Sequence, residues 1–156
     1  MNIGFIGTGA ITTALVTGLC SAELQNLHIT LSPRNRNRSV LLAKKYSQVV
    51  VAETNEGVVH CSDVVFLAFL PQQAEEILGP LRFREKQLVI NLLSGTRNTR
   101  IAELIDASCQ ICRAVPLPYS AERIGPIVLY PVNETAAELF NAIGSVVVAE
   151  REEHLE

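Results

Sequence analysis

Short apolar segments alternate with helical patterns along most of this chain, and this alternation restricts the fold more than any other feature. Residues 64–68 form a continuous apolar run of strand length, as expected for a central strand that is covered on both faces. Residues 3–6 and 88–90 are runs of the same kind, and a helical spacing of apolar residues follows each of them. Strands that alternate with helices in this way predict an α/β fold with a doubly wound, mainly parallel sheet.

The same patterns predict the order of the elements. We expect strands at 3–6, 27–31, 49–51, 64–68, 88–90, 110–114, 127–129 and 146–148. We expect helices at 10–21, 36–46, 98–105 and 134–143, one or two helical turns at 54–61, and a helix that starts at Pro71, a residue that suits a first helical turn. Residues 150–156 are charged and have no evident packing partner.

The composition excludes several classes of protein. The chain has 156 residues, of which 48% are hydrophobic and 19% charged, as expected for a globular domain with a real core. A formal net charge of -3 argues against general nucleic-acid binding, which needs a basic surface. The apolar stretches are too short to cross a bilayer, and the N-terminus lacks the basic start and long apolar run of a signal peptide. We therefore expect a cytoplasmic protein without membrane or nucleic-acid partners.

Four cysteines are present, at positions Cys20, Cys61, Cys109 and Cys112. Cys109 and Cys112 form a C-x-x-C pair, which is compatible with a redox or zinc role. Residues three apart on a strand point to opposite faces of a sheet, a poor arrangement for joint ligation, and no second C-x-x-C or H-x-x-x-H completes a zinc site. We therefore interpret the pair as two small buried strand residues and predict no metal site.

A glycine-rich turn, GTGAIT at residues 7–12, stands directly between the first expected strand and the first expected helix. In such a turn Gly7 permits the tight bend, and Gly9 removes the Cβ atom that would block a pyrophosphate. The helix that follows offers free N–H groups and a partial positive charge to phosphates. Thr12 stands where Gly or Ala is usual, which predicts a slightly looser approach of helix to strand. The turn predicts a Rossmann NAD(P)-binding fold, although a glycine turn can also serve only as a connection.

The end of the second expected strand favours NADP over NAD. An Asp or Glu at this place binds the ribose hydroxyls in NAD-binding domains, whereas here Ser32, Arg34 and Asn35 follow the strand. These side chains can donate hydrogen bonds to a 2′-phosphate, which a carboxylate would repel. Cations at the start of a helix are disfavoured by the positive end of its dipole. A bound phosphate would offset this unfavourable interaction and explain the basic residues at this turn. Arg36 and Arg38 are weaker candidates because they could point into solvent.

Several segments resemble one family. Residues 1–9, MNIGFIGTG, resemble the opening of pyrroline-5-carboxylate reductases. The segments AFLPQQ at 68–73, LVINLLSG at 88–95 and RAVPLP at 113–118 are similar to that family's segments after its fourth strand, at its fifth strand and after its sixth strand. The resemblance covers nearly the whole chain. The chain is also similar to the wider group of NADP-dependent reductases that includes coenzyme F420-dependent enzymes.

The resemblance implies an NADPH-dependent oxidoreductase that transfers hydride to the C=N bond of 1-pyrroline-5-carboxylate and makes proline, a step of amino-acid biosynthesis. It implies a phosphate loop of Gly7, Thr8, Gly9, Ala10 and Ile11, a 2′-phosphate site of Ser32, Arg34 and Asn35, a ribose and nicotinamide cleft lined by Ala68, Leu70 and Pro71, and Ser94 and Gly95 near the nicotinamide. It also implies a small cyclic imine as substrate and a homo-oligomeric parent protein.

Two departures from the family pattern lie close to the expected site of hydride transfer. Leu70 stands in place of a lysine, and Leu117 stands in place of an asparagine. The family's C-terminal helical domain, which carries its substrate site, is absent from these 156 residues. We therefore expect residues 1–150 to form the dinucleotide-binding domain, and residues 151–156 to be the start of a missing C-terminal helical domain or a tail.

No residue is a persuasive catalytic acid, base or nucleophile. His28 and His60 lie apart from the glycine turn and the strand ends. Ser94 has no neighbouring base in sequence, and Tyr119 is typical of a surface loop. Hydride transfer needs positioning rather than a catalytic dyad, because the cofactor carries the chemistry. The sequence leaves open a reductase domain, an NADP-binding regulatory module without turnover, a related F420-dependent NADP reductase-like protein, and a domain with a decayed cofactor site.

Overall fold

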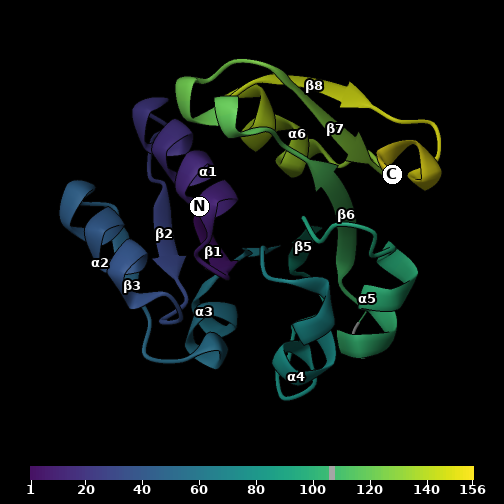
Figure 1. Cartoon of the computed structure of the whole chain (residues 1–156), viewed down its shortest axis with the longest axis horizontal. Helices are drawn as coiled ribbons and strands as arrows, with labels where there is room; N and C mark the ends of the chain where they lie inside the picture. The colour runs from purple at the N-terminus through teal and green to yellow at the C-terminus, as the bar shows by residue number, and fades with distance from the viewer. Residues whose placement is uncertain (106–107) are drawn as a thin grey trace.

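The computed structural model describes residues 1–105 and 108–156, and an eight-stranded sheet forms its middle (Figure 1). The strands lie in the order β3-β2-β1-β4-β5-β6-β7-β8. In chain order they are β1 Asn2–Ile6, β2 His28–Leu31, β3 Val49–Val51, β4 Val64–Leu67, β5 Leu88–Asn91, β6 Gln110–Val115, β7 Pro126–Tyr130 and β8 Ser145–Val148. Each neighbouring pair is parallel except β6 and β7, which are antiparallel.

Helices cover both faces of this sheet. They are α1 Ala10–Ser21, α2 Arg36–Lys45, α3 Asn55–Cys61, α4 Ala74–Leu78, α5 Asn98–Ile105 and α6 Glu134–Asn141, with the short 3₁₀ helices η1 Pro71–Gln73, η2 Pro118–Glu122 and η3 Glu152–Leu155. Buried side chains of α1, α2 and α6 pack on one face, and those of α3, α4 and α5 pack on the other. No helix in the described part of the chain is long and apolar enough to span a membrane.

Alternate residues of the central strands serve the two cores. In β1, Ile3 and Phe5 belong to the core with α1 and α6, whereas Ile6 belongs to the core with α3 and α4. Phe5 stacks on Phe66 of β4 with ring centroids 4.4 Å apart, and Phe66 meets the edge of Phe140 from α6 at 6.0 Å. These aromatic contacts join the two central strands to the helix on that face.

The order of connection reverses between β1 and β4. From β1 the sheet continues through β2 and β3 on one side, and through β4 and β5 on the other. The loops that leave β1 and β4 therefore diverge at the carboxyl ends of these strands, which is the place where open α/β sheets bind ligands.

The doubly wound, mainly parallel α/β fold expected from the sequence is confirmed, and each expected element is present with small shifts at its ends. Pro71 begins a 3₁₀ turn, η1, and the α-helix α4 follows it. The expectation that residues 150–156 have no packing partner was wrong. Leu155 of η3 is buried. Helix η3 lies against β6 and β7, and the carboxylate of Glu152 in η3 pairs with a buried arginine, Arg113 of β6.

Helix α1 lies against η2 at Gly18. A Cβ atom at this position would lie 2.1 Å from the backbone oxygen of Ser120, so only glycine lets the two backbones come this close. The contact holds the segment that follows β6 against α1.

We predict that Gly18→Ala lowers the free energy of unfolding by about 1–3 kcal/mol, because the added methyl group overpacks this contact. Gly57→Ala in α3 is the matched control, since a Cβ atom there meets its nearest neighbours at 3.5 Å. The control should leave stability unchanged or raise it by up to about 1 kcal/mol, because alanine favours a helix. Urea unfolding followed by circular dichroism measures both variants, and an unchanged midpoint for Gly18→Ala would contradict the contact.

Candidate functional site

The glycine turn at residues 7–9 leaves β1 and passes against the backbone that leaves β4. Gly7 has a φ of 95°, in the region that favours glycine. A Cβ atom on Gly7 would lie 2.2 Å from the backbone oxygen of Ala68. The turn therefore depends on glycine for its conformation and for its close approach to the end of β4.

Gly9 precedes α1 and faces open space. No atom from elsewhere in the described chain lies within 4 Å of the place where its Cβ atom would stand, and no side chain caps the helix. The first N–H groups of an uncapped helix lack intrahelical partners, so the start of α1 offers donors and the positive end of a dipole to an anion. Thr12, the departure from a small residue, is buried and donates a hydrogen bond to the carbonyl of Gly7 at 2.8 Å.

Ser32 and Asn35 tie the end of β2 to this turn. The hydroxyl of Ser32 accepts a hydrogen bond from the N–H of Gly7 at 2.9 Å, and the hydroxyl of Thr8 donates to the carbonyl of Ser32 at 3.4 Å. The side-chain amide of Asn35 donates to the carbonyl of Thr8 at 3.0 Å. Ser32 is fully buried, whereas Asn35 is exposed. Ser32 therefore lies beneath the turn as a support.

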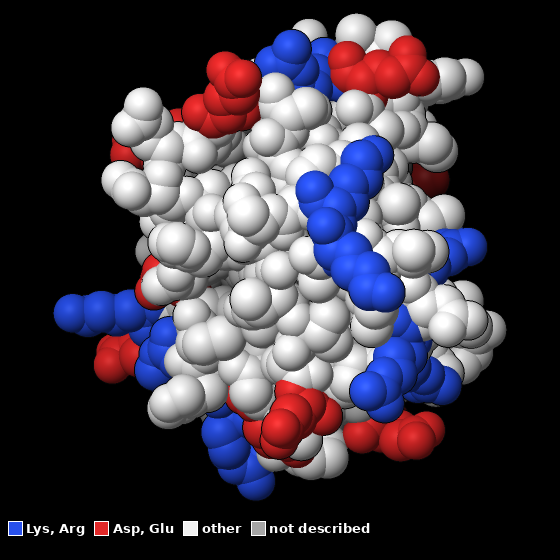
Figure 2. Space-filling model, turned by 90° about the vertical axis from the view of Figure 1, so that its left-hand side faces the viewer, with Lys and Arg blue, Asp and Glu red and all other residues white. Residues whose placement is uncertain are grey.

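Three arginines are exposed around the start of α2: Arg34, Arg36 and Arg38. None of them forms an ion pair with a carboxylate of the described residues. When its amide oxygen is turned toward Arg34, Gln73 accepts hydrogen bonds from Nη1 and Nη2 at 3.1 and 2.7 Å. This contact joins the end of β2 to the turn after β4. Figure 2 shows lysine and arginine side chains across the middle of the face that carries α2, with acidic groups nearer its upper and lower edges.

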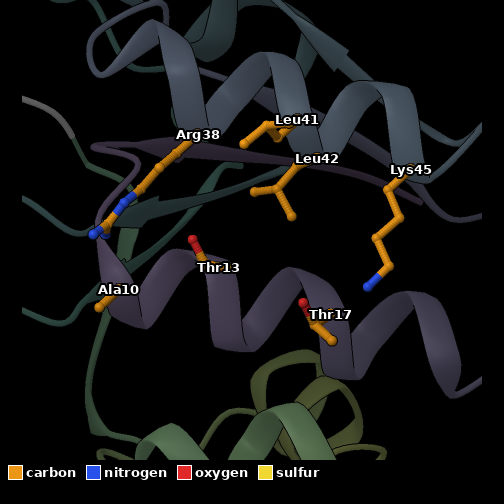
Figure 3. A pocket seen from close by; sticks show the side chains of 7 residues that line it. All are labelled: Ala10, Thr13, Thr17, Arg38, Leu41, Leu42 and Lys45. Carbon is orange, nitrogen blue, oxygen red and sulfur yellow. The ribbon is translucent and has the colours of Figure 1, made fainter.

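Arg38 also faces the start of α1, across a groove between α1 and α2 (Figure 3). The guanidinium of Arg38 reaches toward Ala10, whereas Lys45 lies at the other end of the groove near Thr17. The groove has a volume of about 450 Å³, and its lining residues are Ala10, Thr13, Thr17, Arg38, Leu41, Leu42 and Lys45. From the sequence alone, Arg38 is a weaker candidate for a phosphate contact, because the pattern of residues does not show how α1 and α2 pack against each other.

A groove of about 580 Å³ lies between the segment that runs from η1 into α4 and the segment that runs from the loop after β5 into α5. Pro71 and Gln72 line one side, and Gly95 and Thr96 line the other. Gly95 has a φ of 64°, and Ser94 beside it is exposed. Of the expected residues, Pro71 and Gly95 line this groove, whereas Ala68, Leu70 and Ser94 do not.

Leu70 and Leu117 border the same end of the sheet. Leu70 directly precedes η1 and is 62% exposed, and Leu117 directly precedes η2 and is 37% exposed. Ala68, two residues before Leu70, extends the pairing of β4 with β1, because its N–H donates a hydrogen bond to the carbonyl of Ile6 at 2.8 Å. The positions where the family carries polar side chains thus present apolar surface here.

Cys109 and Cys112 pack in separate cores on opposite faces of the sheet. Cys112 is buried in β6 as expected, whereas Cys109 lies just before β6 and is only partly buried. Cys112 lies in the core with α1 and α6, and Cys109 packs against the core with α3 and α5. Burial raises the pKa of the Cys112 thiol to about 11 and also raises the pKa of Cys109, so both favour the neutral thiol. Within the described residues, no group of three or more His, Cys, Asp or Glu side chains could hold a metal ion.

The doubly wound sheet, the glycine turn at its switch point and the open start of α1 define a Rossmann-type NAD(P)-binding domain. The model of one family, described as NADP oxidoreductase, coenzyme F420-dependent, matches residues 2–95. The chain belongs to this family of NADP-dependent oxidoreductases.

The resemblance to pyrroline-5-carboxylate reductases is confirmed by curated relatives. Pyrroline-5-carboxylate reductase 2 of Bacillus subtilis (strain 168) is 30% identical over 125 residues, which cover 78% of this chain and 45% of that protein. Pyrroline-5-carboxylate reductase of Vibrio alginolyticus is 26% identical over 160 residues, which cover 97% of this chain and 58% of that protein. The chain thus spans about half the length of the curated relatives it matches.

Solved structures of the same kind of protein share the fold. A pyrroline-5-carboxylate reductase from Coxiella burnetii has a TM-score of 0.86 at 25% identity, over 99% of this chain and 60% of that one. The pyrroline carboxylate reductase of Plasmodium falciparum with NADP bound has a TM-score of 0.81 at 18% identity, over 99% of this chain and 59% of that one. In each case the shared part includes nearly all of this chain.

We predict that Ser32→Ala lowers the free energy of unfolding by about 1–2 kcal/mol, because the N–H of Gly7 then loses its acceptor in a part-buried place. Ser94→Ala is the control, since Ser94 is exposed, and its effect should stay within about 0.5 kcal/mol. Thermal unfolding of both variants checks the prediction. Equal melting temperatures for the two variants and the wild type would show that the hydroxyl does not support the turn.

Proposed function

We propose that this chain is the cofactor-binding domain of an NADPH-dependent reductase that transfers hydride to the C=N bond of a small cyclic imine, such as 1-pyrroline-5-carboxylate. One observation carries the cofactor assignment. Arg34 follows the second strand, where NAD-binding domains carry an acid, and the guanidinium of Arg38 reaches toward Ala10 at the start of α1. The substrate class rests on the family and on the named activity of the relatives.

The proposed phosphate loop consists of Gly7, Thr8, Gly9, Ala10 and Ile11. Its fit to a pyrophosphate rests on Gly9, whose open side leaves the backbone accessible. The uncapped N–H groups of α1 can donate to the phosphate oxygens, and the helix dipole favours their negative charge.

Arg34, Asn35 and Arg38 form the proposed 2′-phosphate site. Ser32 is fully buried and bonded to the turn, so its part is to hold the loop rather than to touch the phosphate. Helix α2 and the loop before it contain no acidic residue that would repel a phosphate dianion. Arginine suits this task because its fork donates parallel N–H bonds to phosphate oxygens. Arg34 would exchange its contact with the neutral amide of Gln73 for this stronger acceptor.

The proposed nicotinamide end consists of Ala68, Leu70, Pro71, Ser94 and Gly95. Bound NADPH would supply the hydride, as nicotinamide cofactors do. The role of this chain would be to orient the nicotinamide ring near the segments that follow β4 and β5 and to exclude water beside the ring. Leu70 contributes apolar surface for the second task.

The chain spans about half the length of its curated relatives, so the substrate site is a proposal about the whole protein. We propose a small cyclic imine as the substrate, a homo-oligomer as the working form of the full-length protein, and a place in proline synthesis. The names of the relatives support the substrate class.

A second candidate is an NADP-binding module without turnover. The specific observation in its favour is the pair of exposed leucines, Leu70 and Leu117, where the family pattern has a lysine and an asparagine. Loss of two polar groups beside the hydride-transfer end removes partners for a polar substrate, while the phosphate loop and the basic end of β2 stay intact.

We predict that Gly9→Val abolishes NADPH binding and keeps the fold. The valine side chain enters open space, so it should disturb the phosphate contact without a clash inside the protein. NADPH fluorescence measures the binding, and circular dichroism with thermal unfolding checks that the fold is retained. NADPH binding by a folded Gly9→Val protein at the wild-type affinity would remove the glycine turn from the cofactor site.

We predict that Arg34→Ala and Arg38→Ala each weaken NADPH binding by about tenfold or more, the loss expected for one charge-assisted hydrogen bond. NADH binding should stay unchanged, because NADH lacks the 2′-phosphate. Lys44→Ala is the matched control, since it removes one positive charge from the last turn of α2, outside the groove. Parallel losses of NADPH and NADH affinity would argue against a 2′-phosphate site at these arginines.

Steady-state NADPH oxidation by the full-length protein separates the two candidate functions. The reductase predicts oxidation that depends on added 1-pyrroline-5-carboxylate. Tight NADPH binding without imine-dependent oxidation would contradict the reductase and favour the module without turnover.

A further inference from the structure

Arg113 is a charged side chain in the interior of the protein. It lies on β6, beside Asn91 of β5 and Tyr130 of β7, and is only 2% exposed. Its Nη1 atom lies 3.8 Å from Oε1 of Glu152 and 4.0 Å from Oε1 of Glu156, both in the C-terminal segment. A buried charge is costly unless it is paired. The attraction between Arg113 and these carboxylates therefore stabilises the position of η3 against β6.

The Nη1 atom of Arg113 makes no hydrogen bond within the described part of the chain. The positive charge at this atom is balanced by the negative charges of the two nearby carboxylates. Glu152 is the closer partner, and its side chain is 13% exposed, whereas that of Glu156 is about half exposed. Glu152 is therefore the less screened of the two partners.

Glu152 also holds the start of α5. Its Oε1 atom, the one nearest Arg113, accepts a hydrogen bond from the backbone N–H of Asn98 at 2.6 Å. Asn98 is the first residue of α5, where a carboxylate is favoured by the helix dipole. One carboxylate oxygen thus links a buried strand residue to the first turn of a helix.

The loop between β5 and α5 is consequently anchored at both ends. At its beginning, the side chain of Asn91 donates to the carbonyl of Thr96 at 2.7 Å and accepts from the N–H of Leu93 at 3.0 Å. At its end stands the bond between Asn98 and Glu152. Ser94 and Gly95 lie between these anchors, and this is the segment proposed above to border the nicotinamide.

We infer that Arg113 and Glu152 are positioning residues for the nicotinamide end of the cofactor site. Arg113 fixes η3, the carboxylate of Glu152 fixes the start of α5, and the loop that carries Ser94 is thereby held in one place. The inference rests on the proposed function, because it takes this loop as a border of the nicotinamide. Neither residue belongs to the phosphate loop or to the basic end of β2, so the adenosine half of the cofactor does not depend on them.

The test compares two ligands on the same variants. NADPH contains both halves of the cofactor, whereas adenosine 2′,5′-bisphosphate contains the adenosine half and the 2′-phosphate without the nicotinamide. Glu152→Gln keeps the shape of the side chain and removes its charge. Glu150→Gln is the matched control, because Glu150 is exposed and precedes η3.

We predict that Glu152→Gln weakens NADPH binding by about tenfold, roughly the difference between a charge-assisted and a neutral hydrogen bond, and leaves the affinity for adenosine 2′,5′-bisphosphate unchanged. Glu150→Gln should change neither affinity. An equal loss for both ligands would mean a purely structural role, and no loss for either would mean no role; each overturns the inference while the proposed function stands. A wild-type protein that binds neither ligand would overturn the proposed function and this inference together.

A second variant covers the case in which Glu152→Gln does not fold, because that change leaves a buried arginine partly uncompensated. The double substitution Arg113→Met with Glu152→Leu replaces the ion pair by apolar side chains of similar volume, a change that proteins often tolerate. It removes the carboxylate from the start of α5. The inference predicts the same selective loss of NADPH affinity, and an unchanged ratio of the two affinities in this variant would overturn it.

Discussion

The backbone of the glycine turn lies against the backbone that leaves β4, and this contact is the constraint on which the rest of the site depends. Only a residue without a Cβ atom fits at Gly7, because the carbonyl of Ala68 occupies the space. The close approach brings the carboxyl ends of the two central strands together and leaves the start of α1 uncapped beside them. The uncapped start of α1 therefore lies open at the switch point of the sheet, where it could receive an anion.

The basic end of β2 is coupled to this turn rather than merely adjacent to it. Ser32 and Asn35 join the two segments by hydrogen bonds, while the packing of α2 beside α1 brings Arg38 to the start of α1 (Figure 3). On the other side of the site, the buried pair of Arg113 and Glu152 ties the C-terminal turn to α5. In the proposed site, the residues for the phosphate and the loop for the nicotinamide thus depend on separate polar networks of one sheet.

Much of this arrangement can be predicted from the sequence, because it depends on residues that are close together in the chain. Apolar runs mark the strands of a buried sheet, and the glycine turn and the arginines at the end of β2 are adjacent in sequence to the elements that present them. Three features of the structure cannot be predicted from such local patterns. The place of Arg38 depends on how two helices pack, and Ser32 is buried beneath the turn although its hydroxyl could suit a ligand. The C-terminal segment, residues 150–156, packs beside Arg113, which lies between apolar residues of a strand distant in sequence.

In the proposed site, guanidinium groups at the end of β2 and on α2 bind the 2′-phosphate of NADP. Phosphorus NMR of NADP⁺ titrated with pH, free and bound to the protein, tests this most directly, since a phosphate monoester has its second pKa near 6. Adjacent arginines stabilise the dianion, so we predict that the pKa of the bound 2′-phosphate falls well below its free value. An unchanged pKa in the complex, or a raised one, would contradict the claim.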